Sequence, residues 1–120
     1  MQGEEKRIEN AILEWLAMKD IFAFKVKSQG TWDPTKKVFR SPSKYYKRGT
    51  ADILGIYKCR PLAIEVKSKT GKPTIHQKIF LQAWQDNGGI GFIARSVEDV
   101  MRGLNEGMLG LTVAEARQPG

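Results

Sequence analysis

Ala51–Tyr57 reads ADILGIY, Leu62–Lys67 reads LAIEVK, and the four residues KCRP at 58–61 join them. Both segments are short, aliphatic and rich in β-branched residues, a composition typical of strands. A connection of this length is too short for a crossover and makes an antiparallel hairpin. This hairpin is the feature from which the rest of the fold can be worked out.

The residues after the hairpin predict a helix and one more strand. Pro73-Thr74 opens the helix, which runs to about Asn87, because Thr74 and Gln77 have the spacing of a capping box and Gly88-Gly89 supplies the stop. Residues 90–94 read IGFIA, a short strand of buried type. A strand, a crossover helix and a second strand form a right-handed parallel unit, to which the hairpin adds antiparallel strands. The class is therefore α/β with a mixed sheet.

The flanking segments complete the order α-β-β-β-α-β-α. Apolar residues at helical spacing predict a first helix over 4–18, and 21–27 reads as a strand. Residues 28–48 are expected to form a long basic loop, and Ser96 caps a last helix that ends near Asn105. We expect one domain over 1–120, with its core at about 5–105 and a loosely held tail at 106–120.

Composition excludes several classes of protein. The chain has 120 residues, 41% of them apolar, and its lone cysteine, Cys59, cannot form an internal disulfide. No set of Cys and His has zinc-ligand spacing, and no apolar run approaches the roughly 18 residues of a membrane span. The charged start MQGEEKR precedes no signal segment. We expect a cytoplasmic protein with no membrane association and no small-molecule cofactor.

The net charge of +7 is concentrated in the middle of the chain. Fourteen of the twenty Lys and Arg lie between Lys25 and Lys78, with only three acids between those two positions. Such a segment is either the footprint of a polyanion, most often nucleic acid, or a solvated basic face. The candidate nucleic-acid contacts are Lys27, Lys36, Lys37, Arg40, Lys44, Lys47, Arg48 and Lys69, with Lys72 and Lys78 in support. Trp32, Tyr45 and Tyr46 are interleaved with them and suit either base stacking or packing onto the sheet. Trp15, Trp84, Phe22 and Phe92 are expected in the core.

The hairpin carries two acids in otherwise apolar surroundings, Asp52 and Glu65. If Tyr57 lies opposite Leu62, Asp52 falls opposite Lys67 and diagonal to Glu65, so that the two carboxylates converge. Bare paired carboxylates would repel each other, whereas a divalent cation keeps both ionised. Oxygen ligands select hard cations such as Mg²⁺ or Mn²⁺, which polarise a phosphoryl oxygen and lower the pKa of a bound water. Alternatively, Glu65 and Lys67 are only the outward face of an edge strand.

These residues match the PD-(D/E)xK nuclease pattern, with Ala51 in place of its proline. They lie within a series of four blocks in order: Arg48–Gly55, Ile64–Lys72, Gln77-Lys78 and Gly88-Gly89. Together they resemble the virus-type replication-repair nuclease (VRR-NUC) domain over residues 5–100.

The resemblance implies a restriction-endonuclease-like core and Mg²⁺- or Mn²⁺-dependent hydrolysis of phosphodiesters. Asp52 and Glu65 match the metal-binding acids, the carbonyl of Val66 offers a further ligand, and Lys67 matches the catalytic lysine. Gln77 matches a glutamine that orients water or a ligand. The family's acid on the first helix corresponds to Glu5, with Glu9 in reserve, although both also suit a helix N-terminus. His76, at a position usually acidic in the family, is given no role.

The leading hypothesis is therefore a metal-dependent endonuclease acting on branched or otherwise structured DNA. The chain leaves no room for a separate sequence-reading domain, which favours recognition of shape and backbone. Stand-alone members of the family resemble Holliday-junction resolvases, so the resemblance also implies a homodimer. Two alternatives remain: a flap or nicking nuclease within a replication-repair assembly, and a non-catalytic nucleic-acid-binding module.

Overall fold

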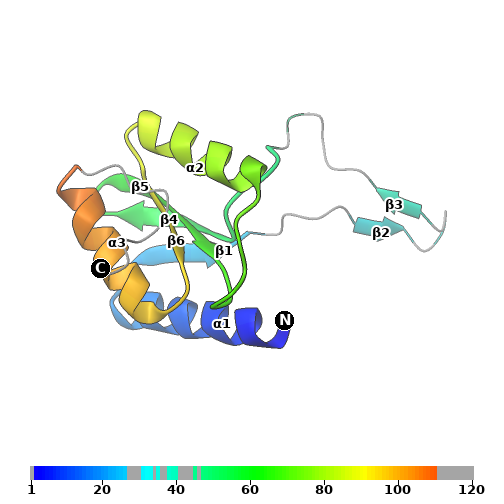
Figure 1. Ribbon diagram of the computed structural model, residues 1–120, viewed down its shortest axis with the longest axis horizontal. Helices are drawn as coiled ribbons and strands as arrows, with labels where there is room; N and C mark the ends of the chain where they lie inside the picture. Colours follow the sequence, from blue (N-terminus) through cyan, green and yellow to red (C-terminus); the bar gives the residue numbers. More distant parts are fainter. Residues whose placement is uncertain are drawn as a thin grey trace.

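The structure is a computed structural model that describes residues 2–26, 31–33, 35, 38–40, 45 and 47–110 (Figure 1). Within these residues the chain forms an α/β fold. The elements are α1 (Gln2–Met18), β1 (Phe22–Lys25), β2 (Thr31–Asp33), β3 (Val38–Arg40), β4 (Ile53–Tyr57), β5 (Arg60–Val66), α2 (Ile75–Asp86), β6 (Ile90–Ala94) and α3 (Val97–Met108).

The main sheet has four strands in the order β1-β4-β5-β6. β1 and β4 are antiparallel, β4 and β5 form the antiparallel hairpin, and β5 and β6 are parallel with α2 as their crossover. The mixed α/β sheet expected from the sequence is thus confirmed. Since β5 lies between β4 and β6, the alternative in which Glu65 and Lys67 sit on an edge strand is wrong.

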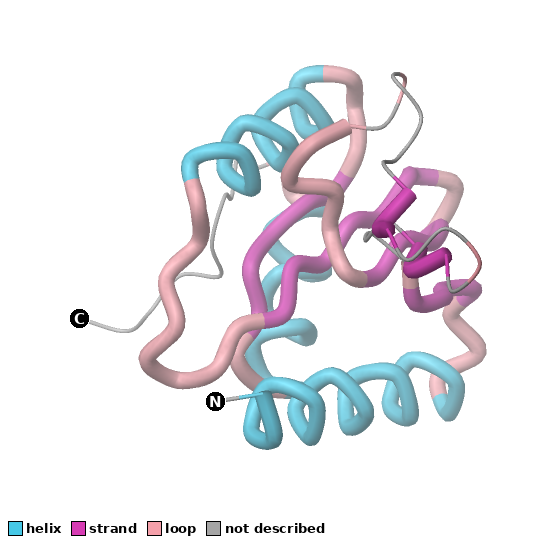
Figure 2. The backbone as a smooth tube through the Cα atoms, turned by 90° about the vertical axis from the view of Figure 1, so that its right-hand side faces the viewer, coloured by secondary structure: helices cyan, strands magenta, loops and turns pink. Residues whose placement is uncertain are grey.

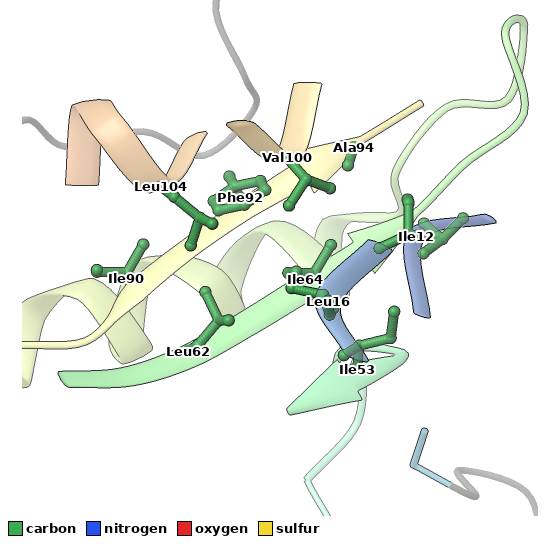
Figure 3. Close-up of a cluster of buried hydrophobic side chains, with 11 residues drawn as sticks. Ile12, Leu16, Ile53, Leu62, Ile64, Ile90, Phe92, Ala94, Val100 and Leu104 are labelled. Carbon is green, nitrogen blue, oxygen red and sulfur yellow. The ribbon is translucent and has the colours of Figure 1, made fainter. Parts of the chain in front are cut away.

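Helices cover both faces of the sheet. α1 and α3 lie on one face and α2 on the other, and in the view of Figure 2 the strands run between the helices with α1 along the bottom. Because side chains alternate along a strand, β5 contributes Ile64 to the first face and Ala63 to the second. The larger cluster joins Ile64 and Phe92 to Leu16 of α1 and Val100 of α3 (Figure 3).

The register of the hairpin differs from the expected one by two residues. Tyr57 lies opposite Arg60, not Leu62, because the turn contains only Lys58 and Cys59. Both turn residues have positive φ, +48° and +68°, the conformation that a two-residue type I′ turn requires and that usually selects Asn or Gly. Lys-Cys gives no such signal. Extending the register by one residue beyond the pair Ile53–Ile64 places Asp52 opposite Glu65, rather than diagonal to it.

The segment predicted as one long loop, 28–48, contains two further strands. β2 and β3 pair antiparallel as a separate two-stranded ribbon, which Figure 1 shows away from the main sheet. The prediction was wrong there because the runs TWD and VFR are only three residues long and are surrounded by turn-forming residues.

The helix ends follow their capping residues. Thr74 caps α2 in a complete capping box with Gln77, as expected, and Ser96 accepts a hydrogen bond from the Asp99 amide at the start of α3. α3 continues to Met108, beyond the expected end near Asn105, and β1 is shorter than the predicted strand 21–27. Among the described residues, no helix combines the length and the apolar character needed to cross a bilayer.

Candidate active site

A polar cleft of about 400 Å³ lies where the end of β5 meets the start of α2, the start of α1 and the segment before β4. Its lining includes most of the residues that the sequence singled out for chemistry. They are Glu5, Arg48, Gly49, Thr50, Asp52, Glu65, Lys67, Thr74, His76 and Gln77. Residues from four separate segments therefore converge on one site.

Asp52 is tied to β5 by its carboxylate. Its Oδ2 accepts a hydrogen bond of 2.9 Å from the backbone amide of Val66, and its own carbonyl accepts one of 2.7 Å from the amide of Val26. The first bond fixes the acid of one strand against the end of the next. The short turn at Lys58-Cys59 makes this possible, because it brings residue 52 level with residue 65.

Glu65 is almost fully buried, with 3% of the residue exposed. Its Oε2 accepts a 2.8 Å hydrogen bond from the side-chain amide of Gln77 and lies 3.7 Å from the Lys67 ammonium. Its Oε1 is also buried, and no donor reaches it within the described part of the chain. A buried carboxylate oxygen without a partner is costly, so this atom calls for a ligand.

Burial raises the pKa of Glu65 from 4.5 to about 9. The negative charge of Asp52 acts in the same direction, followed by a hydrogen bond shared with Asp52 and by the charge of Glu5, while Lys67 opposes the shift. Two carboxyl groups this close share a proton when no cation separates them. A divalent cation would remove the repulsion and release that proton.

The oxygen atoms that could act as metal ligands in this cleft fit a hard cation in part. Glu65 Oε1 is free to coordinate, Asp52 contributes a second carboxylate, and oxygen ligands suit Mg²⁺ and Mn²⁺. No cluster of three or more His, Cys, Asp or Glu with metal-binding geometry occurs among the described residues. A cation here would thus depend on two carboxylates, with backbone oxygens such as the Val66 carbonyl and water completing its shell, as is usual for Mg²⁺.

Lys67 is held at the mouth of the cleft by the backbone on both sides of it. Its amide donates to the carbonyl of Ala94 in the neighbouring strand at 3.1 Å. The turn that follows is closed by the bond from the Gly71 amide to Ser68 Oγ, and the Arg95 guanidinium donates to the carbonyls of Ser68 and Gly71. The side chain of Lys67 is 13% exposed, so its ammonium faces Glu65 from a mostly desolvated position.

Gln77 performs two tasks at once. Its Oε1 accepts from the Thr74 amide at 2.8 Å and its Nε2 donates to Glu65 at 2.8 Å, so one amide both closes the capping box and binds the carboxylate. The Thr74 N–H donor on one side and the Glu65 acceptor on the other fix which end of the side-chain amide is oxygen. The expected capping box and a contact with the Glu65 carboxylate therefore coexist on this one side chain.

The two candidate acids of α1 are in different places. Glu5 lines the cleft and adds its charge to the field at Glu65. Glu9 lies one turn further on, is 8% exposed and pairs with Lys25 at 3.2 Å. The structure brings Glu5, and not the reserve residue Glu9, to the carboxylate pair.

Three cleft residues were given no role by the sequence. His76 and Thr50 lie half-buried in the wall, and Gly49 approaches α2 so closely that an added Cβ would lie 2.3 Å from the His76 carbonyl carbon. The position of His76 directly before Gln77, on the first turn of a helix that opens on the cleft, is the signal that could have found it. Gly49 and Thr50 lie in the turn before β4, where the sequence carries no comparable signal of a site.

The structure places only part of the predicted basic surface. Lys47 and Arg48 are exposed, and Arg48 lines the cleft. The lysines that follow Lys67 in the sequence, Lys69, Lys72 and Lys78, are exposed as well. Arg40 belongs to β3. Lys27, Lys36, Lys37 and Lys44 lie outside the described residues, as does Tyr46.

No model of a known protein family matches the chain, and no curated protein sequence matches it. The chemistry of the cleft is therefore inferred from its own geometry.

Proposed function

We propose that this protein is a divalent-metal-dependent endonuclease that hydrolyses phosphodiester bonds in structured DNA. The observation that supports this function best is the buried oxygen Glu65 Oε1, which no donor from the described residues reaches, next to the carboxylate of Asp52. A protein that only binds nucleic acid gains nothing from two acids turned toward phosphates. The same residues support a restriction-endonuclease-like core, of which the mixed sheet and its helices would be the frame.

Six side chains of the cleft have a part in this proposal. Asp52 and Glu65 hold Mg²⁺ or Mn²⁺, Glu5 adds negative charge beside them, and Gln77 keeps the Glu65 carboxylate in place. Lys67 stabilises the charge that develops on the phosphate oxygens during attack by water, or orients that water. Arg48, exposed at the rim, binds a neighbouring phosphate of the same strand.

When bound, a divalent cation supplies charge neutralisation between the carboxylates and polarisation of the scissile phosphate. The chain supplies the rest of the chemistry. It aligns the acceptors on two adjacent strands, excludes water from Glu65 and holds an ammonium 3.7 Å from that carboxylate. The exclusion of water and the nearby ammonium favour a reaction that builds negative charge in a desolvated site.

Cleavage of labelled DNA tests the proposal. Four-way junction, flap, single-stranded and duplex substrates are incubated with Mg²⁺, Mn²⁺ or chelator. We expect cleavage only with metal, and a loss of roughly 100-fold or more in Asp52→Asn and Glu65→Gln, the scale typical of removing one group that stabilises a transition state. DNA binding should persist in both variants, and it should tighten in Asp52→Asn, which removes a negative charge.

Glu9→Gln is the matched comparison for Glu5→Gln, since both remove one acid from the same helix. Only the Glu5 variant should slow cleavage, because Glu9 is engaged with Lys25. Cleavage at the wild-type rate by Asp52→Asn would reject the metal site. Binding without scission under every condition would favour the non-catalytic module.

The substrate series also separates the two nuclease hypotheses. A junction resolvase cuts two strands symmetrically and acts as a homodimer that presents two clefts, whereas a flap or nicking nuclease cuts one strand. Light scattering of the free protein gives the number of copies. Symmetric cuts by a dimer would support the resolvase reading that we favour.

A further inference from the structure

A second hollow, of about 550 Å³, lies along α2 beside the candidate active site. Apolar side chains form most of its wall, namely Pro61, Ile79, Phe80, Ala83 and Trp84. We call this hollow the α2 groove. Ile79 is 58% exposed although it is a large aliphatic side chain on a helix, so apolar surface is left open to a partner.

The aromatic wall of the groove is fixed in place. The rings of Phe80 and Trp84 stack at 5.5 Å between centroids with 24° between their planes. The Trp84 indole donates a 3.1 Å hydrogen bond to the Pro61 carbonyl, and both rings pack against the cluster of Ala63, Leu81 and Ile93. A rigid aromatic surface of this kind receives a flat ligand without losing conformational freedom on binding.

Cationic side chains connect the groove to the polar cleft. Arg48 lines both hollows, and Lys47 beside it lines the groove as well. The described residues that line the groove include no acid, whereas Glu5, Asp52 and Glu65 line the cleft. The occupant of the groove should therefore join an apolar, flat group to a phosphate, with Arg48 at the junction between the two sites.

We propose that the α2 groove receives the unpaired nucleobase of the nucleotide next to the phosphodiester held at Asp52 and Glu65. This inference rests on the proposed function and adds the class of substrate to it. A base inside a duplex is stacked on both faces and paired along one edge, so it cannot enter a groove walled by a helix. A nucleotide in a single strand, a flap or the centre of a junction can unstack into it.

The groove predicts structure-selective rather than sequence-selective recognition. Its wall offers apolar and aromatic contacts, which every base satisfies through its flat face. Arg48 and Lys47 contact phosphates, which carry no sequence information. Unpaired nucleotides next to the cut site, and not a base sequence, thus define the substrate.

Photocrosslinking locates the base. The wild-type protein, in chelator so that no strand is cut, is irradiated with a single-stranded oligonucleotide carrying 5-iodouracil and then digested with trypsin. Cleavage after Lys78 and Arg95 releases the peptide 79–95, which contains Phe80 and Trp84. We expect the crosslink in this peptide, and its absence when the iodouracil is paired within a duplex.

Two matched variants measure the contribution of the groove. Ile79→Ser removes apolar surface from the wall, while Ile75→Ser changes an equally exposed isoleucine (64%) on the same helix outside the groove. By fluorescence anisotropy, Ile79→Ser should weaken single-strand binding by roughly fivefold, a fraction of the effect of one base–aromatic stack, and Ile75→Ser by less than about twofold. Both side chains are exposed, and thermal melting confirms that each variant is folded.

Three outcomes would overturn the inference: crosslinks that avoid the peptide 79–95, equal weakening by the two variants, or dissociation of an oligomer by Ile79→Ser alone. The last would identify the groove as a contact between two copies of the chain. Crosslinking at 79–95 by a protein that cuts no DNA would support base binding while rejecting the nuclease. Cleavage without that crosslink would reject the groove alone.

Discussion

Glu65 has to lose a proton before it can hold a cation. With a pKa of about 9, caused first by burial and then by Asp52, the carboxyl is neutral at pH 7 in the metal-free protein. Binding of Mg²⁺ or Mn²⁺ therefore competes with a proton, and affinity for the metal should rise with pH up to about 9. Activity would follow the same direction, because the metal-loaded fraction increases.

The same carboxyl makes the stability of the metal-free protein depend on pH. The unfolded chain titrates this group near 4.5 and the folded chain near 9, so the folded state holds the extra proton between these values. The free energy of unfolding should therefore fall as pH rises from 5 to 9. Urea unfolding in chelator at pH 5, 7 and 9 measures the slope.

Glu65→Gln provides the control for this prediction. The amide cannot ionise, so the part of the slope that belongs to Glu65 should vanish, while Glu9→Gln should keep it. Added Mn²⁺ should restore stability at high pH in the wild type only. An identical decline in wild type and Glu65→Gln would show that other groups cause the pH dependence.

The start of α2 is the element that organises the cleft. Its capping box fixes Gln77, and Gln77 fixes Glu65, so the first turn of this helix connects backbone structure to the chemistry of the site. Gly49 lets the turn before β4 lie directly against it. Helix and turn thus depend on each other for their positions.

Gly49→Ala tests that close approach. Gly49 has φ of +76°, and a Cβ would lie 2.3 Å from the backbone of His76, so both the turn and α2 would have to move. We expect a loss of stability of roughly 3 kcal/mol, from left-handed strain plus overpacking, together with slower cleavage. Chemical unfolding and the cleavage assay provide the two measurements.

Gly88→Ala is the matched control, because Gly88 has φ of +91° but no atom of the described residues lies within 4 Å of an added Cβ. It should cost only the conformational strain, about 1–2 kcal/mol, and should leave cleavage by the folded protein unchanged. Equal stability losses at the two positions would mean that contact with α2 is unimportant.

Across the whole molecule, the two ends of β5 have different tasks. At one end Glu65 lines the cleft, and the Val66 amide donates to the Asp52 carboxylate. At the other end the Arg60 guanidinium donates to the carbonyls of Gly88, Gly89 and Gly107 at 3.1, 3.5 and 2.6 Å. Arg60 therefore joins the sheet to the turn after α2 and to the last turn of α3, far along the strand from the acids.

Arg60→Lys should separate stability from function. Lysine keeps the charge but lacks the planar guanidinium group that reaches three carbonyls. A hydrogen bond from a charged group contributes about 1.5–3 kcal/mol to stability. We expect the free energy of unfolding to drop by about 1–2 kcal/mol, measured in urea, with unchanged cleavage per folded molecule. A large loss of cleavage in the folded variant would show that the two ends of β5 are coupled.

Much of this fold was predictable because its signals are local. The capping box at Thr74 and Gln77 and the alternation of Ala63 and Ile64 on β5 each depend on a few neighbouring residues, and the structure confirms them. The strands β2 and β3 were missed because three-residue runs give too weak a pattern. The hairpin register was wrong by two, since Lys58-Cys59 adopts positive φ without the usual Asn or Gly.

The residue chemistry of the cleft was already present in the sequence: acids at 52 and 65, a lysine at 67 and a glutamine at 77, on a hairpin and a helix. Strand periodicity singled out residues 52, 65 and 67, because it dictates which side chains share a face, whereas Gln77 was chosen by the family resemblance. Only the tertiary structure decided that Asp52 lies level with Glu65, that Glu5 rather than Glu9 joins them, and that one oxygen of Glu65 is buried where no donor of the described chain reaches it. These facts depend on contacts between segments distant in sequence, and burial, which shifts the pKa of Glu65, exists only once those segments have packed together.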